Sequence, residues 1–259
     1  MIRRTLKKVI WDEIAPRLRK VHGKSFGSFA FKGRDIKTDI RDKYGYRGAL
    51  LDIYASNQDR KVHKWHHYIP LYDRYFATYK GRPIRFLEIG VSEGGSLQLW
   101  RKYFGQDAVI FGIDINPNCA SLNGISAQVR IGSQDDPKFL QDVVKEMGGI
   151  DIVLDDGSHQ MHHIRSTLLQ LFPHLSTGGI YVIEDLHTSY WQDFGGGFVF
   201  GNNFYLFLFQ LVHDMHHWYH FRPPRLKSIS GHCTGIHIHD SFVVLDKGEV
   251  HSPVHSLVG

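Results

Sequence analysis

Short β-branched apolar runs alternate with longer segments of helical periodicity along most of the chain. Apolar residues at consecutive positions are typical of strands that are buried on both faces of a parallel sheet. Such runs predict strands at 83–89, 109–113, 128–131, 150–155 and 179–183, and the periodicity between them predicts helices at 97–103, 138–146 and 164–175. The chain is therefore predicted to be an α/β protein with a mostly parallel, twisted sheet.

The pattern changes after the last of these strands. Residues 204–218 predict a largely buried helix that ends before Pro223-Pro224. Residues 226–250 predict two antiparallel edge strands, at 235–239 and 242–246, joined by a turn. The parallel sheet is thus expected to end in an antiparallel C-terminal hairpin.

The N-terminal part differs from the rest in charge. Residues 1–47 hold 14 Lys and Arg against 5 Asp and Glu, whereas residues 48–259 hold 17 against 21. We therefore divide the chain into a basic helical extension, 1–57, and a main domain, 58–259. Apolar residues at helical spacing predict a basic amphipathic helix at the start of the extension, formed around Ile2, Leu6, Val9, Ile10 and Ile14.

Between this helix and the first strand the pattern is weaker. The glycine-rich residues 22–48 are predicted to be an irregular connection, followed by short helices at 50–55 and 71–76. A basic amphipathic helix can lie on an anionic membrane surface or near a lipid-linked substrate, but docking on its own domain or on a partner subunit is the favoured interpretation. Because the main domain is not basic, we expect no nucleic-acid partner.

Composition adds an expectation about location. No apolar run approaches the roughly 18–20 residues of a membrane span, and the N-terminus lacks the continuous apolar stretch of a secretory signal. Cys119 and Cys233 lie far apart, without metal-ligand spacing. This usage is typical of a protein of the reducing cytoplasm without a disulfide framework.

The turn after the first predicted strand is rich in glycine and predicts a ligand-binding loop. A glycine turn that leads into a helix lets a ligand approach free backbone N–H groups. The dinucleotide pattern fails at its middle position, where a serine stands, which disfavours an NAD-dependent oxidoreductase. The remaining pattern suits a nucleoside with a short charged tail, and its candidate residues are Glu88, Gly90, Ser92, Gly94 and Ser96.

Polar residues at the ends of the next two strands extend this candidate site. Asp114 ends the second strand, where a carboxylate can accept hydrogen bonds from ribose hydroxyls. Ser133, Gln134 and Asp135 follow the third strand and can meet an adenine edge, although Asp135 or Asp136 is equally suited to cap the next helix.

Carboxylates gather after the fourth and fifth strands. Asp155 and Asp156 end the fourth strand and Glu184 and Asp185 end the fifth, while His159 follows closely. Right-handed crossover brings both strand ends to one edge of the sheet, where the acids repel one another unless a divalent cation binds them. Acidic residues and serines at such positions can also cap helices. We therefore assign Asp155 either a structural role or a role in binding the cofactor, and not a role in binding the metal.

These motifs together resemble class I S-adenosylmethionine (SAM) methyltransferases. More narrowly, Asp155-Asp-Gly-Ser-His159 with Glu184-Asp-Leu-His-Thr-Ser-Tyr-Trp191 is similar to the metal-dependent sugar O-methyltransferases of the macrocin and mycinamicin type. Rhamnosyl and polysaccharide O-methyltransferases and the cephalosporin hydroxylase/methoxylation protein are also similar. The resemblance covers about residues 58–250 and implies a Rossmann-like fold.

The resemblance also implies an activity and its residues. It implies SAM- and Mg²⁺-dependent transfer of a methyl group to a sugar hydroxyl of a glycan, glycolipid or glycosylated natural product, in a homo-oligomer. Asp156, Glu184 and Asp185 would bind Mg²⁺, and His159 would be the general base. A protein of the cephalosporin hydroxylase/methoxylation type, without transferase activity of its own, is the alternative.

A sugar hydroxyl is a weak acid and needs a cation and a base to react at neutral pH. His187 is a second candidate base or a group that supports the first. Tyr190 and Trp191 follow it and can stack on a sugar face, although packing within the loop is equally consistent with their position. We therefore expect the acceptor to bind beside these three residues.

Overall fold

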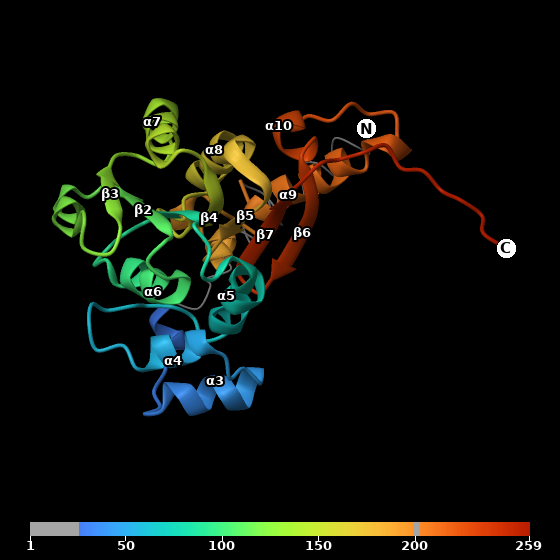
Figure 1. Ribbon diagram of the computed structural model, residues 1–259. Coiled ribbons are helices and arrows are strands. Elements are labelled where there is room, and N and C mark those ends of the chain that lie inside the picture. Colours follow the sequence, from blue (N-terminus) through green and yellow to red (C-terminus); the bar gives the residue numbers. More distant parts are fainter. Residues whose placement is uncertain (1–25, 199–201) are drawn as a thin grey trace, which may run out of the picture.

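A seven-stranded sheet forms the centre of the molecule, with strand order β3-β2-β1-β4-β5-β7-β6 (Figure 1). The computed structural model describes residues 26–198 and 202–259. Only β7 runs against its neighbours, so the predicted mostly parallel sheet with a C-terminal antiparallel hairpin is confirmed. The strands are β1 (Arg85–Ile89), β2 (Val109–Asp114), β3 (Gln128–Ile131), β4 (Ile150–Asp155), β5 (Leu175–Ile183), β6 (Cys233–His239) and β7 (Phe242–Lys247).

Helices cover both faces of this sheet (Figure 1). Consecutive residues of a strand enter opposite cores: Phe86 of β1 and Ile152 of β4 belong to one buried cluster, and Leu87 and Val153 belong to the other. The first cluster packs under α3 (Ile36–Tyr44), α4 (Ala49–Ala55), α5 (Tyr68–Phe76) and α6 (Gly95–Phe104), and the second under α7 (Pro137–Met147), α8 (Met161–Leu171) and α9 (Phe204–Met215). Burial on both faces explains why the central strands lack a polar alternation.

The prediction that 22–48 is an irregular connection is wrong for its second half. Residues 26–29 form the 3-10 helix η2 (Phe26–Phe29), and α3 follows. The side chain of Asp35 accepts the backbone N–H of Thr38 and caps α3, while Gly45 ends it with φ +66°. These are the start and stop signals of a helix, and the density of glycines around them outweighed them in the prediction.

Other predicted boundaries need smaller corrections. The helix predicted at 164–175 is α8, which begins three residues earlier and continues as the 3-10 helix η5 (Phe172–His174). The helix predicted at 204–218 ends at Met215 and is followed by the 3-10 helix η8 (His217–Tyr219). Of the two predicted edge strands only β6 lies at the edge, because β7 pairs with both β5 and β6.

The predicted amphipathic helix at Ile2–Ile14 lies outside the described residues. Within the extension, Ile40 of α3 and Leu50 and Leu51 of α4 are fully buried in the same cluster as the sheet. The boundary between 57 and 58 remains a prediction. No helix in the described part of the chain is both long and apolar enough to cross a membrane.

Candidate functional site

A cavity of about 710 Å³ opens at the C-terminal ends of β1, β2, β4 and β5. Ligands bind at this edge in open α/β sheets, because the strand-to-helix loops converge there. Most of the predicted site residues line the cavity: Gly90, Ser92, Ser96, Asp114, Ser133, Gln134, Asp156, His159, Glu184, Asp185, His187 and Trp191.

The glycine loop after β1 is fixed by Asp114. One carboxylate oxygen of Asp114 accepts the backbone N–H groups of Val91 and Ser92, both at 2.9 Å, and the other accepts that of Asn116 at 2.8 Å. Gly90 has φ +91°, and a Cβ built on it would lie 2.1 Å from the backbone oxygen of Asp156. The loop therefore lies directly against the acidic end of β4, and only glycine fits at this position.

Four predicted cofactor residues do not line the cavity. Glu88 is fully buried and accepts hydrogen bonds from Ser96 and Trp100, and burial raises its pKa to about 7. Asp155 accepts hydrogen bonds from Tyr181 and Gln134, and burial raises its pKa to about 6. The other two are Gly94, which precedes α6, and Asp135, whose side chain faces His163.

Three side chains at the ends of β4 and β5 point toward one another. The ligand atoms of Asp156, His159 and Asp185 all lie within 4.8 Å of one another. His159 Nε2 is 3.9 Å from Asp156 Oδ1 and 3.8 Å from Asp185 Oδ2. His159 and Asp185 each have φ +55°, an uncommon value for residues other than glycine that clusters at functional sites.

Lys64 places a positive charge among these acids. Its ammonium lies 2.6 Å from Asp156 Oδ2 and 3.0 Å from Glu184 Oε2, and Tyr72 also donates to Glu184. Burial by itself lowers the pKa of Lys64, but the attraction of the two carboxylates outweighs it and the pKa is raised. Burial and the charge of Asp156 raise the pKa of Glu184 well above its ordinary value, which Lys64 only partly offsets.

Asp185 is oriented by the segment that follows Lys64. Its Oδ1 accepts hydrogen bonds from Trp65 Nε1 at 2.9 Å and from the Tyr68 hydroxyl at 3.0 Å. In the same way, Lys64 donates a hydrogen bond to Oδ2 of Asp156. The other oxygen of each carboxylate, Asp156 Oδ1 and Asp185 Oδ2, faces His159.

The turn between β6 and β7 supports this arrangement from the other side. Ser241 has φ +60°, and its carbonyl oxygen accepts the Tyr68 hydroxyl at 2.9 Å and the backbone N–H of Leu186 at 3.0 Å. The Ser241 hydroxyl accepts the backbone N–H of His187 at 2.9 Å and lies 2.7 Å from Nδ1 of the same residue. The C-terminal hairpin thus fixes the residues that follow Asp185.

The donor set of the three converging side chains fits a divalent cation. Two carboxylate oxygens are ligands of the kind that Mg²⁺ prefers, and an imidazole beside them is suited to accept a proton. Glu184, the third predicted ligand, instead lies against Lys64 and Tyr72 in this structure. The ammonium of Lys64 lies between Asp156 and Glu184, so its charge offsets the repulsion of these two carboxylates without a divalent cation.

Aromatic rings form the outer side of the cavity. We call Phe26, Trp65, His187, Trp191 and Phe194 the aromatic wall; all five line the cavity. Their ring centroids lie close together: Phe26–Trp65 at 5.4 Å, Trp65–His187 at 5.4 Å, His187–Trp191 at 4.7 Å and Trp191–Phe194 at 5.9 Å. Tyr190 is not part of the wall, because its ring packs beside Phe198 and Tyr205.

Sequence reasoning missed the roles of Lys64, Trp65, Tyr68 and Tyr72. The density of aromatic and histidine residues at 61–70 is a signal that this segment covers a ligand. A single lysine within it carries no local sign that its ammonium lies between two acids. This pairing joins positions 92 and 120 residues apart and becomes visible only in the folded chain.

Comparison with known proteins agrees with the fold and the motifs. Residues 87–186 match the model of a methyltransferase domain family. The chain is 37% identical over 227 residues to 8-demethyl-8-(2-methoxy-alpha-L-rhamnosyl)-tetracenomycin-C 3'-O-methyltransferase of Streptomyces olivaceus, over 83% of this chain and 58% of the relative. It is 34% identical over 225 residues to demethylmacrocin O-methyltransferase of Streptomyces fradiae, over 79% of this chain and 55% of the relative.

Solved structures of the MycE methyltransferase from the mycinamycin biosynthetic pathway are also similar. The complex with Mg, S-adenosylhomocysteine (SAH) and mycinamycin VI aligns with a TM-score of 0.65 at 26% identity, over 95% of this chain and 61% of that chain. A complex with Mg and SAH aligns with a TM-score of 0.62 at 28% identity, over 84% of this chain and 56% of that chain. The chain spans less than two thirds of the length of these relatives. The resemblance and the Rossmann-like fold predicted from the sequence are confirmed.

Proposed function

We propose that this chain transfers a methyl group from SAM to a sugar hydroxyl with the help of Mg²⁺, because residues 87–186 match a methyltransferase domain family and the chain is similar to sugar O-methyltransferases. The acceptor class is a glycan, a glycolipid or a glycosylated natural product. The observation that carries the proposal is the position of Asp156, His159 and Asp185. They lie in one cavity, which the glycine loop and the aromatic wall also line.

The cofactor half of the cavity suits a nucleoside with a charged tail. Asp114 has further acceptor capacity for ribose hydroxyls beside the glycine loop, and Ser92 and Ser96 line the same region. Ser133 and Gln134 also line the cavity and would meet an adenine edge. For Glu88, Gly94 and Asp155 we propose an indirect role, because they support the loops that would hold the cofactor.

The acceptor half would hold a hydroxyl beside the proposed base, His159. Asp156 and Asp185 would hold Mg²⁺, with Glu184 as the predicted third ligand, and bound Mg²⁺ would lower the pKa of the acceptor hydroxyl. His159 then accepts the hydroxyl proton at Nε2. The oxygen forms a bond to the SAM methyl carbon as the carbon–sulfur bond breaks, and its electron pair remains on the sulfur of SAH. His159 finally returns the proton to solvent.

The aromatic wall gives the acceptor a face to stack on. Trp191 and His187 lie beside the acids, so a sugar bound against them would present its hydroxyl toward His159. Tyr190 points to Phe198 and is better suited to shape the loop than to contact the sugar. The acceptor is thus selected by ring stacking and by the hydroxyl that reaches the acids.

Mass spectrometry of saccharide and glycoside acceptors after incubation with SAM and Mg²⁺ tests the proposal. We expect a mass gain of one methyl group, its loss with EDTA, and a loss of at least 100-fold in rate for His159→Ala. His174→Ala, at an exposed position away from the cavity, is the matched control. Absence of SAM binding by calorimetry in the presence of Mg²⁺ would refute the proposal.

Two further features remain part of the proposal. A homo-oligomer is suggested by the resemblance, and size-exclusion chromatography with light scattering measures it. A reducing location is supported by Cys119 and Cys233, which are both buried and free.

A further inference from the structure

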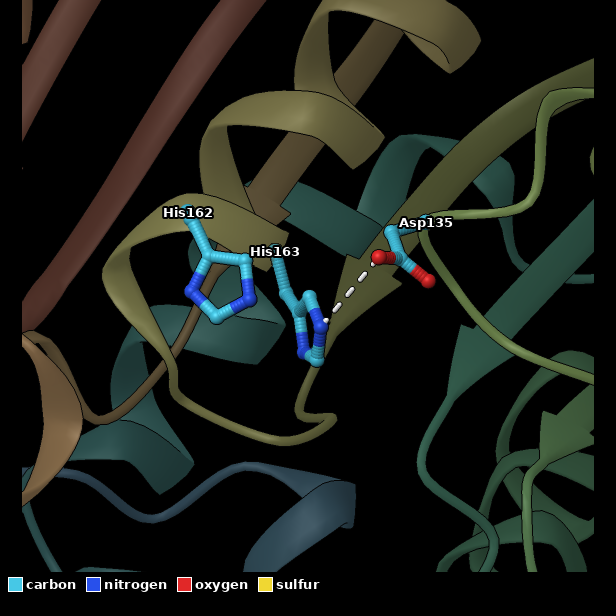
Figure 2. A group of neighbouring side chains, drawn as sticks. All are labelled: Asp135, His162 and His163. Carbon is cyan, nitrogen blue, oxygen red and sulfur yellow. Dashed lines mark ion pairs between the residues drawn. The ribbon is translucent and has the colours of Figure 1, made fainter.

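Figure 2 shows a second group of side chains that could hold a metal ion, Asp135, His162 and His163. Asp135 belongs to the loop between β3 and α7, and His162 and His163 belong to the first turn of α8. Their ligand atoms all lie within 4.8 Å of one another. In the described part of the chain, only this group and the acidic one at Asp156 bring three such residues together.

Two serines orient this group. Ser158 Oγ lies 2.7 Å from His163 Nδ1, and the Ser133 hydroxyl donates to Asp135 Oδ1 at 2.5 Å. The other nitrogen of His163, Nε2, faces Asp135 Oδ2 at 3.4 Å. Hydrogen bonds to the far atoms of a ligand fix its ring or carboxylate, as in established metal sites. His163 Nε2 and Asp135 Oδ2 are therefore presented toward the same point.

The two imidazoles complete the group. The ring centroids of His162 and His163 lie 4.0 Å apart, and Figure 2 shows the rings side by side at the start of the helix. Each of the two rings offers one nitrogen within 4.8 Å of a carboxylate oxygen of Asp135. An ion pair between Asp135 and a protonated His163 would account for the contact between these two residues. It would not account for the position of the His162 ring beside them.

We propose that Asp135, His162 and His163 bind a first-row transition cation of the Zn²⁺ type, at a site separate from the Mg²⁺ site of the proposed function. Two imidazoles and one carboxylate suit Zn²⁺, Co²⁺ or Ni²⁺, whereas Mg²⁺ prefers oxygen ligands. His162 and Asp135 are exposed, so the cation can enter from solvent and keep water as its remaining ligand.

The proposed cation site lies beside the part of the cavity that is proposed to hold the cofactor. Ser133, Gln134, Ser158 and His163 all line the cavity. A cation held by Asp135 and the two histidines would tie the loop after β3 to the start of α8, on either side of the region proposed for adenine. Occupancy of the site would therefore change the affinity for SAM without contacting the reacting atoms.

Co²⁺ titration of the full chain, without an affinity tag, tests the site. The chain is held in saturating Mg²⁺, so that the acidic group is occupied, and Co²⁺ binding is followed by visible absorption. We expect one Co²⁺ per chain, displaced by Zn²⁺, with an affinity that falls at least tenfold in His162→Gln and in Asp135→Asn. His232→Gln, also at an exposed histidine, is the control and should bind as the wild type.

The outcomes separate this site from the proposed function. Equal Co²⁺ affinity in the wild type and in His162→Gln would overturn the site, because His162 is exposed and its replacement leaves the fold intact. Loss of Co²⁺ binding in His162→Gln with Mg²⁺-dependent SAM binding retained would establish it. A Co²⁺ signal that disappears only in Asp156→Asn would place the cation at the acidic group and would also overturn the site.

Discussion

The charge of Lys64 holds together acids from two strands. Its ammonium contacts Asp156 and Glu184, and its side chain is only 3% exposed. Removing one partner of a buried ion pair leaves the others without compensation, which is more costly than the net contribution of the pair. The stability of the free protein should therefore depend on this one side chain.

Replacement of Lys64 by methionine should lower the free energy of unfolding by about 3–5 kcal/mol at pH 8. The pKa of Glu184 is raised in the folded state, so protonation favours folding, and the deficit should shrink as pH falls through that raised pKa. Urea unfolding at pH 8 and pH 5 measures both effects. Lys138→Met, at a side chain that is 82% exposed, is the control. Equal stability of the two variants would contradict this role.

The acids themselves were predictable residue by residue, because each follows a buried strand directly in the sequence. The orientation of their oxygens was not. Trp65 and Tyr68 donate to Asp185 from a segment 117 to 120 residues away, and no local pattern encodes that contact. Glu184, the acid predicted as a third metal ligand, lies against Lys64 for the same reason.

Among the elements, β4 carries interactions at both of its ends. Its C-terminal end delivers Asp156, and near its N-terminal end Asp151 accepts hydrogen bonds from Arg85 of β1 through Nε at 3.0 Å and a terminal nitrogen at 2.7 Å. The same guanidinium reaches Ser176 of β5 at 2.8 Å. One ion pair thus joins three adjacent strands at the edge opposite the cavity.

Asp151→Asn should lower the free energy of unfolding by about 1.5–3 kcal/mol at pH 7. Burial alone raises the pKa of Asp151, but the hydrogen bonds of Arg85 outweigh it and the pKa is lowered in the folded state. Its contribution is therefore present above the unfolded pKa of about 3.9 and is lost as pH falls through the lower folded value. Chemical unfolding of wild type and variant should converge in this acid range.

Asp142→Asn gives the comparison for that experiment. Asp142 pairs with Lys138 on the exposed face of α7, with 62% of its side chain exposed, so its replacement should have little effect at any pH. A pH-independent loss in Asp151→Asn would show that packing, and not the charge, is what the residue supplies.

The turn between β1 and α6 is the element that joins the proposed cofactor half of the cavity to the acids. Gly90→Ala should abolish SAM binding and destabilise the fold by more than the roughly 1–3 kcal/mol of a strained backbone, because its Cβ would meet the backbone of Asp156. Gly124→Ala isolates the strain, since Gly124 has φ +81° and no atom within 4 Å of its built Cβ. Calorimetry with SAM and thermal unfolding compare the two. Retention of SAM binding in Gly90→Ala would remove the loop from the proposed site.

Element type was predictable where apolar runs are long, and element boundaries were less so. The five parallel strands stand out because they are buried on both faces. Helix α3 was hidden, since its mean hydropathy is low and glycines surround it, although Asp35 and Gly45 mark its two ends. Caps are weak signals in a sequence unless an apolar stripe lies between them.

At the scale of the molecule, the extension and the main domain share one core. Ile40, Leu50 and Leu51 are fully buried, and they pack with the residues of the first buried cluster. The charge count set residues 1–47 apart, which marks a surface property, and the family resemblance begins at about residue 58. Burial follows from packing, which charge does not report.

A fragment that begins at residue 58 should therefore unfold at lower denaturant concentration than the full chain. Leu50→Ala should cost about 2–5 kcal/mol, as expected for a leucine truncated in a packed core. Leu206→Ala is the control, because Leu206 is 53% exposed. If the fragment and the full chain unfold at the same midpoint, the boundary at 57/58 divides two independent units.

The Ser241 turn has a consequence for the time at which the protein becomes functional during translation. Its carbonyl and hydroxyl groups fix Tyr68 and His187, which lie far earlier in the chain. A nascent polypeptide can form β1 through β5 while the codons for β6 and β7 are still being read. The edge of the cavity at Tyr68 and His187 nevertheless stays incomplete until β6 and β7 have left the ribosome.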